Sequence, residues 1–175
     1  MKLYICEICG DAYIGTEKPS DCPFCGARNN FIKLADEAQP IVNIKAEISE
    51  QSKKNLMETL ALETRANSIY LCMAGKSQEY KINKMYKRLA KVELEHATIV
   101  MKLLGIAMPE IKEEVCADDR QENFAETIKL EDHATELYKK FTVESTEEHI
   151  RKFFGALAQV EQGHIDLIQS LSVGK

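Results

Sequence analysis

The sequence lacks the features of a membrane or secreted protein. No apolar run approaches the roughly 18 residues of a membrane-spanning helix, and the first residues, MKLYICEICG, contain no basic region followed by a long apolar stretch. We therefore expect a soluble cytoplasmic protein with neither a membrane span nor a signal peptide. The sequence also has no basic cluster and carries a net charge of −5 at pH 7, which argues against a nucleic-acid partner.

The cysteines are few and unevenly placed. Four of the six lie within the first 25 residues, in the two Cys-x-x-Cys pairs Cys6–Cys9 and Cys22–Cys25. A glycine follows each pair and lets the backbone amides turn toward the sulfurs. Four thiolates at this spacing predict a tetrahedral metal site rather than disulfides in a reducing compartment. Zinc ribbons use the same spacing, so zinc and iron are alternatives, and the rest of the chain favours iron.

One part of the chain is repeated. Residues LETRANSIY (62–70) and VELEHA (92–97) correspond, 68 positions later, to LEDHATELY (130–138) and VEQGHI (160–165). Each copy offers a glutamate and then, about thirty residues on, the motif Glu-x-x-His. The candidate ligands are Glu63, Glu93 and His96 in the first copy and Glu131, Glu161 and His164 in the second.

The spacing of Glu-x-x-His places both side chains on one face of a helix. Residues three apart are separated by about 60° around the helix axis, so Glu93 and His96 can point at one metal ion. Antiparallel packing of four helices would bring the glutamates and histidines together as the ligand set of a carboxylate-bridged dinuclear iron or manganese site. Four carboxylates balance two divalent cations, whereas without metal they would be buried like charges. A solvated helix face is disfavoured because the motif occurs twice in equivalent register.

The periodicity predicts four helices. Apolar and ligand residues recur in alternating steps of four and three, as in the inward stripe of a bundled helix. We expect helices at about 50–75, 79–104, 121–143 and 146–171. Ser49 is the expected N-cap of the first helix, Gly105 and Pro109 are expected to end the second, and Ser145 with Glu148 is the expected capping box of the fourth. Residues 105–120 lack a helical period, and we expect them to form a long crossover. We expect residues 35–49 to form a linker with a short strand at 41–44.

The remaining candidates have less specific patterns. Tyr70 and Tyr138 follow their glutamates by two turns on the same face, where they either donate hydrogen bonds to ligand carboxylates or simply pack. Glu95 faces elsewhere and is expected to be solvated, His133 faces away from the site and is expected to be a surface or packed histidine, and His149, near a helix start, is expected to be exposed. Cys72 and Cys116 have no partner at metal spacing, and we expect a core residue and a loop residue.

The chain as a whole resembles a rubrerythrin of the reverse-order type, in which a rubredoxin-like module precedes the di-iron domain. Tyr4-x-Cys6, Cys9-Gly10, Tyr13 and Cys22-Pro23-x-Cys25 are similar to a rubredoxin iron centre, and the repeated Glu and Glu-x-x-His are similar to the di-iron ligands. The resemblance implies a mainly α fold, with a ferritin-like four-helix bundle and a small N-terminal rubredoxin-like module. The implied domains are the module at 1–34, a linker at 35–49 and the di-iron bundle at 50–175.

The resemblance also implies a function, that of a non-haem di-iron oxidoreductase of the peroxidase type. Such a protein reduces hydrogen peroxide, or dioxygen, to water with electrons from an external reductase. The implied relay is an iron bound by Cys6, Cys9, Cys22 and Cys25, and the implied di-iron ligands are Glu63, Glu93, His96, Glu131, Glu161 and His164, with Tyr70 and Tyr138 around them. In this family the relay can reach the di-iron site of a second subunit, which implies a homodimer.

One position departs from the family pattern. Typical rubrerythrins carry a second glutamate one turn after the ligand of the third helix, and that glutamate exchanges with a histidine as the irons change oxidation state. This sequence has Ala134 there. The departure puts the exchange and the choice of peroxide as substrate in question. The alternative function is that of a ferroxidase or iron-handling protein of the ferritin type.

Overall fold

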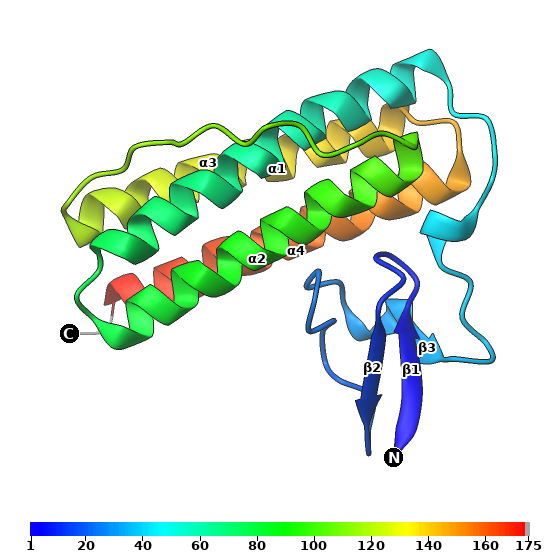
Figure 1. The fold of residues 1–175 in the computed structure, drawn as a ribbon, viewed down its shortest axis with the longest axis horizontal. Coiled ribbons are helices and arrows are strands. Elements are labelled where there is room, and N and C mark those ends of the chain that lie inside the picture. The colour runs from blue at the N-terminus through cyan, green and yellow to red at the C-terminus, as the bar shows by residue number, and fades with distance from the viewer. Residues whose placement is uncertain (174–175) are drawn as a thin grey trace.

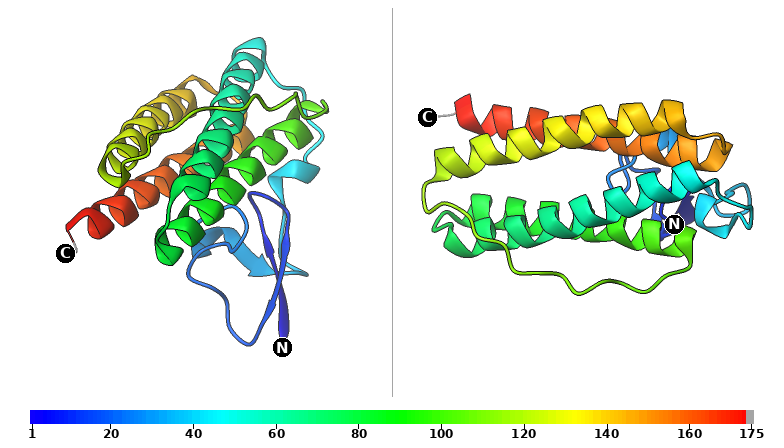
Figure 2. Two further views of the ribbon diagram at one scale, coloured as in Figure 1. Left: turned by 60° about the vertical axis from the view of Figure 1, so that its left-hand side comes forward. Right: turned by 90° about the horizontal axis from the view of Figure 1, so that it is seen from above.

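The computed structural model describes residues 1–173, which form four long helices and a small antiparallel sheet (Figure 1). The helices are α1 (Glu50–Lys76), α2 (Tyr80–Leu104), α3 (Arg120–Glu144) and α4 (Glu148–Val173). Helix α1 packs along α2 and α3 packs along α4, and the two pairs lie side by side as a bundle (Figure 2). This confirms the predicted mainly α four-helix architecture. None of the helices within residues 1–173 is long and apolar enough to cross a membrane.

The helix ends agree with the sequence pattern except at the start of α4. The Ser49 side chain accepts a hydrogen bond from the Ser52 amide at 3.3 Å, as an N-cap does. Helix α2 ends at Gly105, whose φ of 66° is the left-handed conformation that favours glycine. The prediction of a capping box at Ser145 was wrong. Ser145 instead ends α3, and its hydroxyl donates a hydrogen bond to the Phe141 carbonyl at 2.7 Å.

The first turn of α4 is also more enclosed than its sequence indicates. We expected His149 to be exposed, but only 7% of its surface is accessible, and the neighbouring Ile150 is fully buried. The expectation was wrong because this end of α4 packs into the bundle, together with Phe153 and Phe154 one turn later. A residue near the start of a helix is exposed only when no other element covers that end.

The predicted crossover, which connects α2 to α3, runs along the length of the bundle (Figure 2). It is fastened to α1 at several points, including a hydrogen bond from the Glu114 amide to the Ser68 hydroxyl at 2.9 Å. Cys116 lies in the crossover, as expected, but it forms a disulfide with Cys72 of α1 that the sequence did not indicate. A separation of 44 residues carries no sequence signal for pairing, so only the folded chain reveals it.

The N-terminal module is a three-stranded sheet with two metal-binding turns. Its strands are β1 (Lys2–Cys6), β2 (Ala12–Gly15) and β3 (Ile32–Leu34), in the order β2-β1-β3. The expectation of a strand at 41–44 was wrong, because Ile41–Asn43 forms a single 3₁₀ turn. The Ile41 amide donates to the Glu7 carbonyl at 2.8 Å and the Gln39 amide donates to the Glu7 carboxylate at 3.1 Å, which ties the linker to the module but forms no ladder.

The module and the bundle share one apolar core. The four paired cysteines and Ile41 belong to the same buried cluster as Leu56, Ala97 and the phenylalanines of α4. Gly26 has a φ of 76°, and a Cβ atom there would lie 2.8 Å from Val160 of α4. Because even an alanine would collide, the second metal-binding turn is seated directly on α4. The module is therefore held at a fixed place on the bundle.

Glu147, in the turn between α3 and α4, fastens that turn to the start of α1. Its carboxylate accepts hydrogen bonds from the Ser49 amide at 2.5 Å and from the Ser52 hydroxyl at 2.6 Å. Burial opposes ionisation, but the hydrogen bonds from Ser52 and Ser49 lower the pKa of Glu147 to about 2. The stabilisation is therefore present above the ordinary carboxyl pKa and is lost as the pH falls toward the lowered value.

We predict that Glu147→Gln lowers the free energy of unfolding at about pH 7 by about 1 kcal/mol, a value kept small because the group is partly exposed. The difference from the wild type should shrink as the pH falls from about 4.5 to about 2, since both side chains are then uncharged. Urea titrations across that range measure it. Glu148→Gln, at the exposed neighbouring position, is the control. A destabilisation that does not change with pH would contradict the role of the charge.

Candidate metal centres

The four paired cysteines meet at one point of the module. All four are buried and unoxidised, and the sulfur atoms of Cys6 and Cys25 lie 3.8 Å apart and those of Cys9 and Cys22 lie 3.7 Å apart. Tetrahedral coordination with metal–sulfur bonds of about 2.3 Å requires sulfurs about 3.8 Å apart. The cage therefore has the dimensions of a four-thiolate metal site. The Asp11 amide, 3.5 Å from the Cys9 sulfur, is a backbone donor to it.

The six repeated glutamates and histidines come together inside the bundle. Each helix contributes: α1 gives Glu63, α2 gives Glu93 and His96, α3 gives Glu131, and α4 gives Glu161 and His164. All six are buried, with at most 8% of the surface of any one accessible. They form two overlapping groups, Glu63–Glu93–His96–Glu161 and Glu93–Glu131–Glu161–His164, each with ligand atoms within 4.8 Å of one another.

The distances divide the carboxylates into shared and single ones. Nδ1 of His96 lies 3.1 Å from one oxygen of Glu93 and 3.3 Å from one oxygen of Glu161. Nδ1 of His164 lies 3.3 Å and 2.9 Å from the other oxygens of the same two residues. Glu93 and Glu161 thus offer one oxygen to each group, whereas Glu63 belongs only to the first and Glu131 only to the second. In a dinuclear site, Glu93 and Glu161 would be able to bridge the two metal ions, and Glu63 and Glu131 would be terminal ligands of one ion each.

Buried atoms without partners test whether a metal fits. Among residues 1–173, both carboxylate oxygens of Glu93, both of Glu161, and Nδ1 of His96 are buried and lack a hydrogen-bond partner. Leaving so many polar atoms unsatisfied would cost several kcal/mol. Two divalent cations would accept these donor atoms and match the four negative charges. The donor set therefore fits a pair of metal ions.

Without cations, the site has to hold protons. Burial, followed by the charge of Glu161, raises the pKa of Glu131 to about 7, and the same causes raise the pKa of Glu93 well above its usual range. Burial opposes a charged imidazole, but Glu63 and Glu161 raise the pKa of His96 well above its ordinary value. Metal binding has to displace these protons, so metal affinity should rise with pH.

Two tyrosines hold the terminal carboxylates from the opposite helix. The Tyr70 hydroxyl of α1 donates to Glu131 of α3 at 2.5 Å, and the Tyr138 hydroxyl of α3 donates to Glu63 of α1. Burial and the nearby carboxylates raise the pKa of both tyrosines well above the ordinary value, so both keep their protons. The sequence placed both tyrosines beside the site but did not indicate that each reaches the glutamate of the other repeat.

One hydrogen bond joins the two sites. Nε2 of His96 lies 2.9 Å from the backbone oxygen of Cys25, and Nδ1 of the same ring faces the carboxylates. When Nδ1 binds a cation, Nε2 carries the proton and donates to that carbonyl. Cys25 belongs to the thiolate cage, so a ligand residue of one site contacts a ligand residue of the other within the same chain.

A small cavity reaches the carboxylates between α1 and α3. Its volume is about 150 Å³, and Ala66 and Ala134 line it together with Glu63 and Glu131. His133 is exposed, but the expectation that it faces away from the site was wrong, because it lines this cavity together with the carboxylates. No sequence pattern indicated this opening, which exists because both repeats have alanine where a larger side chain would fill the space.

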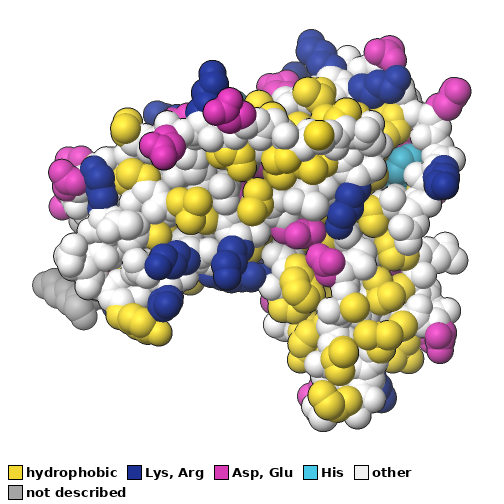
Figure 3. Space-filling view, in the orientation of Figure 1, with side chains coloured by type: hydrophobic (Ala, Val, Ile, Leu, Met, Phe, Trp, Pro, Cys, Tyr) yellow, Lys and Arg dark blue, Asp and Glu magenta, His cyan; other side chains and the backbone are white. Residues whose placement is uncertain are grey.

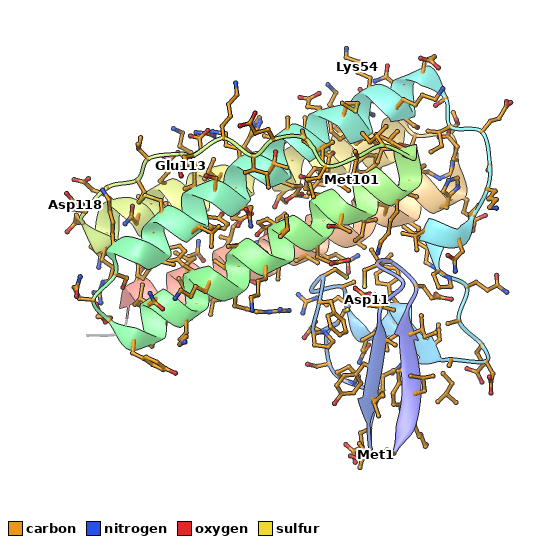
Figure 4. The ribbon with its side chains drawn as sticks, in the orientation of Figure 1. Met1, Asp11, Lys54, Met101, Glu113 and Asp118 are labelled. Carbon is orange, nitrogen blue, oxygen red and sulfur yellow. A yellow bond between two sulfur atoms is a disulfide. The ribbon has the colours of Figure 1, made fainter. Side chains whose placement is uncertain are left out.

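Glu95 lies at the junction of the module and the bundle rather than in solvent. It is half-buried and lies near Asp11 and Cys9, and one of its oxygens has no hydrogen-bond partner within the described chain, although the Lys102 ammonium lies 3.9 Å from it. Burial, followed by the charge of Asp11, raises the pKa of Glu95 to about 7. The expectation of a solvated residue was wrong because α2 presents this position to the module, whose Asp11 lies at the end nearest the bundle (Figure 4).

Comparisons with known proteins agree with this architecture. The sequence pattern of the family described as Rubrerythrin matches residues 54–172. The protein described as Reverse rubrerythrin-1 from Clostridium acetobutylicum is 29% identical over 114 residues, which cover 60% of this chain and 63% of that protein. A solved structure of a hypothetical protein from Pyrococcus furiosus has a TM-score of 0.57 at 20% identity, covers 68% of this chain and 86% of its own, and shows likeness of fold.

We predict that Glu161→Gln abolishes metal binding at both positions of the carboxylate site, because Glu161 offers an oxygen to each group. Protein purified anaerobically should contain about three irons per chain, one in the thiolate cage and two in the bundle, and the variant about one. Elemental analysis measures the metal content. Ferrous iron should also raise the melting temperature of the wild type more than that of the variant.

The matched control is Glu58→Gln, an exposed glutamate of the same helix as Glu63 that points to solvent. It should keep the full iron content and the full thermal shift. Equal iron content in the Glu161 and Glu58 variants would contradict the assignment of the bridging carboxylate.

Proposed function

The chain belongs to the rubrerythrin family, in the reverse arrangement with its thiolate module first, and from this premise we propose that it reduces hydrogen peroxide to water with electrons from an external reductase. Family membership implies a di-iron centre, and the two clusters fit a di-iron site and a rubredoxin-like iron site. We assign the di-iron ligands to Glu63, Glu93, His96, Glu131, Glu161 and His164, and the thiolate ligands to Cys6, Cys9, Cys22 and Cys25. We also assign the domains to 1–34, 35–49 and 50–175.

The observation that carries the proposal is the hydrogen bond between His96 and the Cys25 carbonyl. It connects a carboxylate-site ligand to a thiolate-site ligand through a few covalent bonds and one short contact. A protein that only stored iron would have no need for a connected thiolate site. The link lies within one chain, so this path requires no second subunit, and the homodimer remains a prediction.

The remaining residues fit the handling of a small oxidant. When bound, two ferrous ions supply the two electrons that, with two protons, convert one hydrogen peroxide to two waters. The cavity lined by Ala66 and Ala134 has a volume of about 150 Å³, which provides space for a molecule as small as hydrogen peroxide. Tyr70 and Tyr138 hold the two terminal carboxylates in place, and their raised pKa values keep both phenols neutral.

Ala134 supports a second candidate, a ferroxidase or iron-handling role. It lines the cavity beside Glu131, where it leaves open space and no further carboxylate. Without an additional glutamate there, ligand exchange of the usual family type has no partner residue at this position. An open, exchange-free site could oxidise incoming ferrous ions with dioxygen, so the identity of the oxidant distinguishes the two roles.

We predict that peroxide oxidises the diferrous protein at least about tenfold faster than dioxygen at equal concentration, since peroxide needs only the two electrons of one site. Stopped-flow absorbance of the ferric product measures both rates in a single turnover. Ala134→Leu should slow both oxidants, because it fills the cavity, while Ala61→Leu on the exposed face of α1 should not. Faster reaction with dioxygen, or release of ferric iron, would instead support the ferroxidase.

We predict that Cys9→Ser separates electron delivery from the chemistry in the bundle. A hydroxyl among three thiolates weakens iron binding and shifts its potential, but leaves the carboxylate site intact. The prereduced variant should react with peroxide at the wild-type rate in one turnover, while steady-state turnover with a reductase should fall by at least about a hundredfold. The double variant Cys72→Ser and Cys116→Ser controls for loss of cysteine elsewhere. Unchanged steady-state turnover of Cys9→Ser would exclude the module as the electron entry point.

A further inference from the structure

The first half of α2 carries a strongly basic surface. Between residues 80 and 92 there are five cationic side chains and no acidic one, although the whole chain has a net charge of −5. All five are exposed. The α2 basic surface consists of Lys81, Lys84, Lys87, Arg88 and Lys91. The expectation that the chain has no basic cluster was therefore wrong, because a net charge averages over the whole chain and hides a local concentration.

These cations are not neutralised by the protein itself. Within residues 1–173, none of the five lies within 4 Å of a carboxylate oxygen, whereas many other exposed cations, such as Lys53, Lys139 and Arg120, are ion-paired. The spacing places Lys84, Lys87 and Lys91 along one face of the helix. Tyr80 is 78% exposed at one end of that face and Leu94 is 36% exposed at the other. A row of unpaired positive charges flanked by exposed apolar side chains is suited to steering and contacting a partner of opposite charge.

The α2 basic surface ends at the thiolate site. The Arg88 guanidinium donates hydrogen bonds to the carbonyls of Pro23 and Phe24, which lie in the turn between Cys22 and Cys25. Phe24 is 37% exposed, so this turn is accessible from solvent beside the helix. Figure 3 shows Lys and Arg side chains gathered along the lower edge of the bundle, next to the place where the module projects. A protein bound to these cations would lie against the thiolate site.

We propose that the α2 basic surface docks the acidic face of a one-electron donor protein, a small flavin or iron–sulfur protein, with its cofactor placed against Phe24 and the Cys22–Cys25 turn. The inference rests on the proposed function, which requires an electron donor, and adds where that donor binds and what charge it carries. In the transfer, the donor cofactor loses one electron and the ferric ion in the thiolate cage gains it. No bond forms or breaks, and no proton is required.

Two physical arguments favour an acidic redox protein over other anionic partners. Complementary charge raises association rates by about 10- to 1,000-fold and raises affinity to a smaller extent, which suits a donor that has to bind and leave twice per turnover. The surface also lies in the angle between the bundle and the projecting module, so a flat membrane cannot approach it closely (Figure 1). Duplex DNA is also anionic but cannot serve as the electron donor. Binding of DNA to this surface is one of the outcomes that the test distinguishes.

The test compares two triple variants with the same change in charge. The first, Lys84→Glu, Lys87→Glu and Lys91→Glu, reverses the α2 basic surface and leaves Arg88 in contact with the module. The control, Lys45→Glu, Lys54→Glu and Lys112→Glu, reverses three exposed lysines elsewhere. Lys54, for example, lies near the start of α1, on the side of the bundle away from the module (Figure 4). The probe is an acidic flavodoxin in its fully reduced state.

Stopped-flow reduction of the oxidised thiolate centre should be at least about tenfold slower in the surface variant than in the wild type at low salt, and the control should stay within about twofold. The difference should shrink at about 0.5 M salt, where exposed charges are screened. Dithionite, a small reductant, should reduce all three proteins alike. Calorimetry with oxidised flavodoxin and the zinc-loaded protein, which transfers no electron, should show weaker binding for the surface variant only.

Two outcomes would overturn the proposal. Equal reduction rates in the surface and control variants would show that the donor docks elsewhere. Binding of a short DNA duplex that only the surface variant loses, together with unchanged reduction by flavodoxin, would assign the surface to nucleic acid. Single-turnover oxidation of the prereduced proteins by peroxide tests the proposed function separately. If it fails in all three proteins, the peroxidase is excluded whatever the docking result.

Discussion

The structure depends on keeping four carboxylates and two imidazoles buried in two overlapping groups, within each of which the ligand atoms lie within 4.8 Å of one another. Such a cluster is unstable without positive charge, and the bundle surrounds it so that only cations or protons can supply that charge. Two apolar clusters close the bundle on either side of it, one shared with the module and one around Tyr86 and Phe124. The tyrosine hydrogen bonds between α1 and α3 then fix the terminal carboxylates. The helices therefore provide both the ligands and the exclusion of water that makes metal binding strong.

The ligands are nearly symmetric, but their surroundings are not. His96 and His164 hold equivalent places in the repeat, yet only the His96 ring is joined to the module, through the Cys25 carbonyl. His164 instead lines a cavity of about 230 Å³ with Gly26 and Arg28. The module thus makes the two halves of an otherwise repeated site different from each other. The His96 half of the site is thus hydrogen-bonded to a residue of the thiolate cage and the His164 half is not, although both halves share Glu93 and Glu161.

Regular features could be read from the sequence, whereas contacts between distant segments could not. The repeat of Glu and Glu-x-x-His predicted which side chains meet, because helix periodicity fixes the face on which each one lies. Ser49 and Gly105 predicted helix ends because caps are local. The capping box at Ser145 failed because Ser145 served the preceding helix and Glu147 reached across to α1. The Cys72–Cys116 pair, the burial of His149 and the position of Glu95 against the module all depend on tertiary packing, which leaves no periodic signal.

The disulfide has a consequence for the integrity of the chain. The crossover is the longest connection in the bundle and lies on its surface, where proteases usually cut. A cut between residues 105 and 115 would separate α1 and α2 from α3 and α4, but Cys72 and Cys116 lie on opposite sides of it and would keep the fragments covalently joined. Each metal position takes ligands from both fragments, since His96 shares its group with Glu161 and His164 shares its group with Glu93. A nicked molecule would therefore remain a single particle, with both halves of the metal site held at high local concentration.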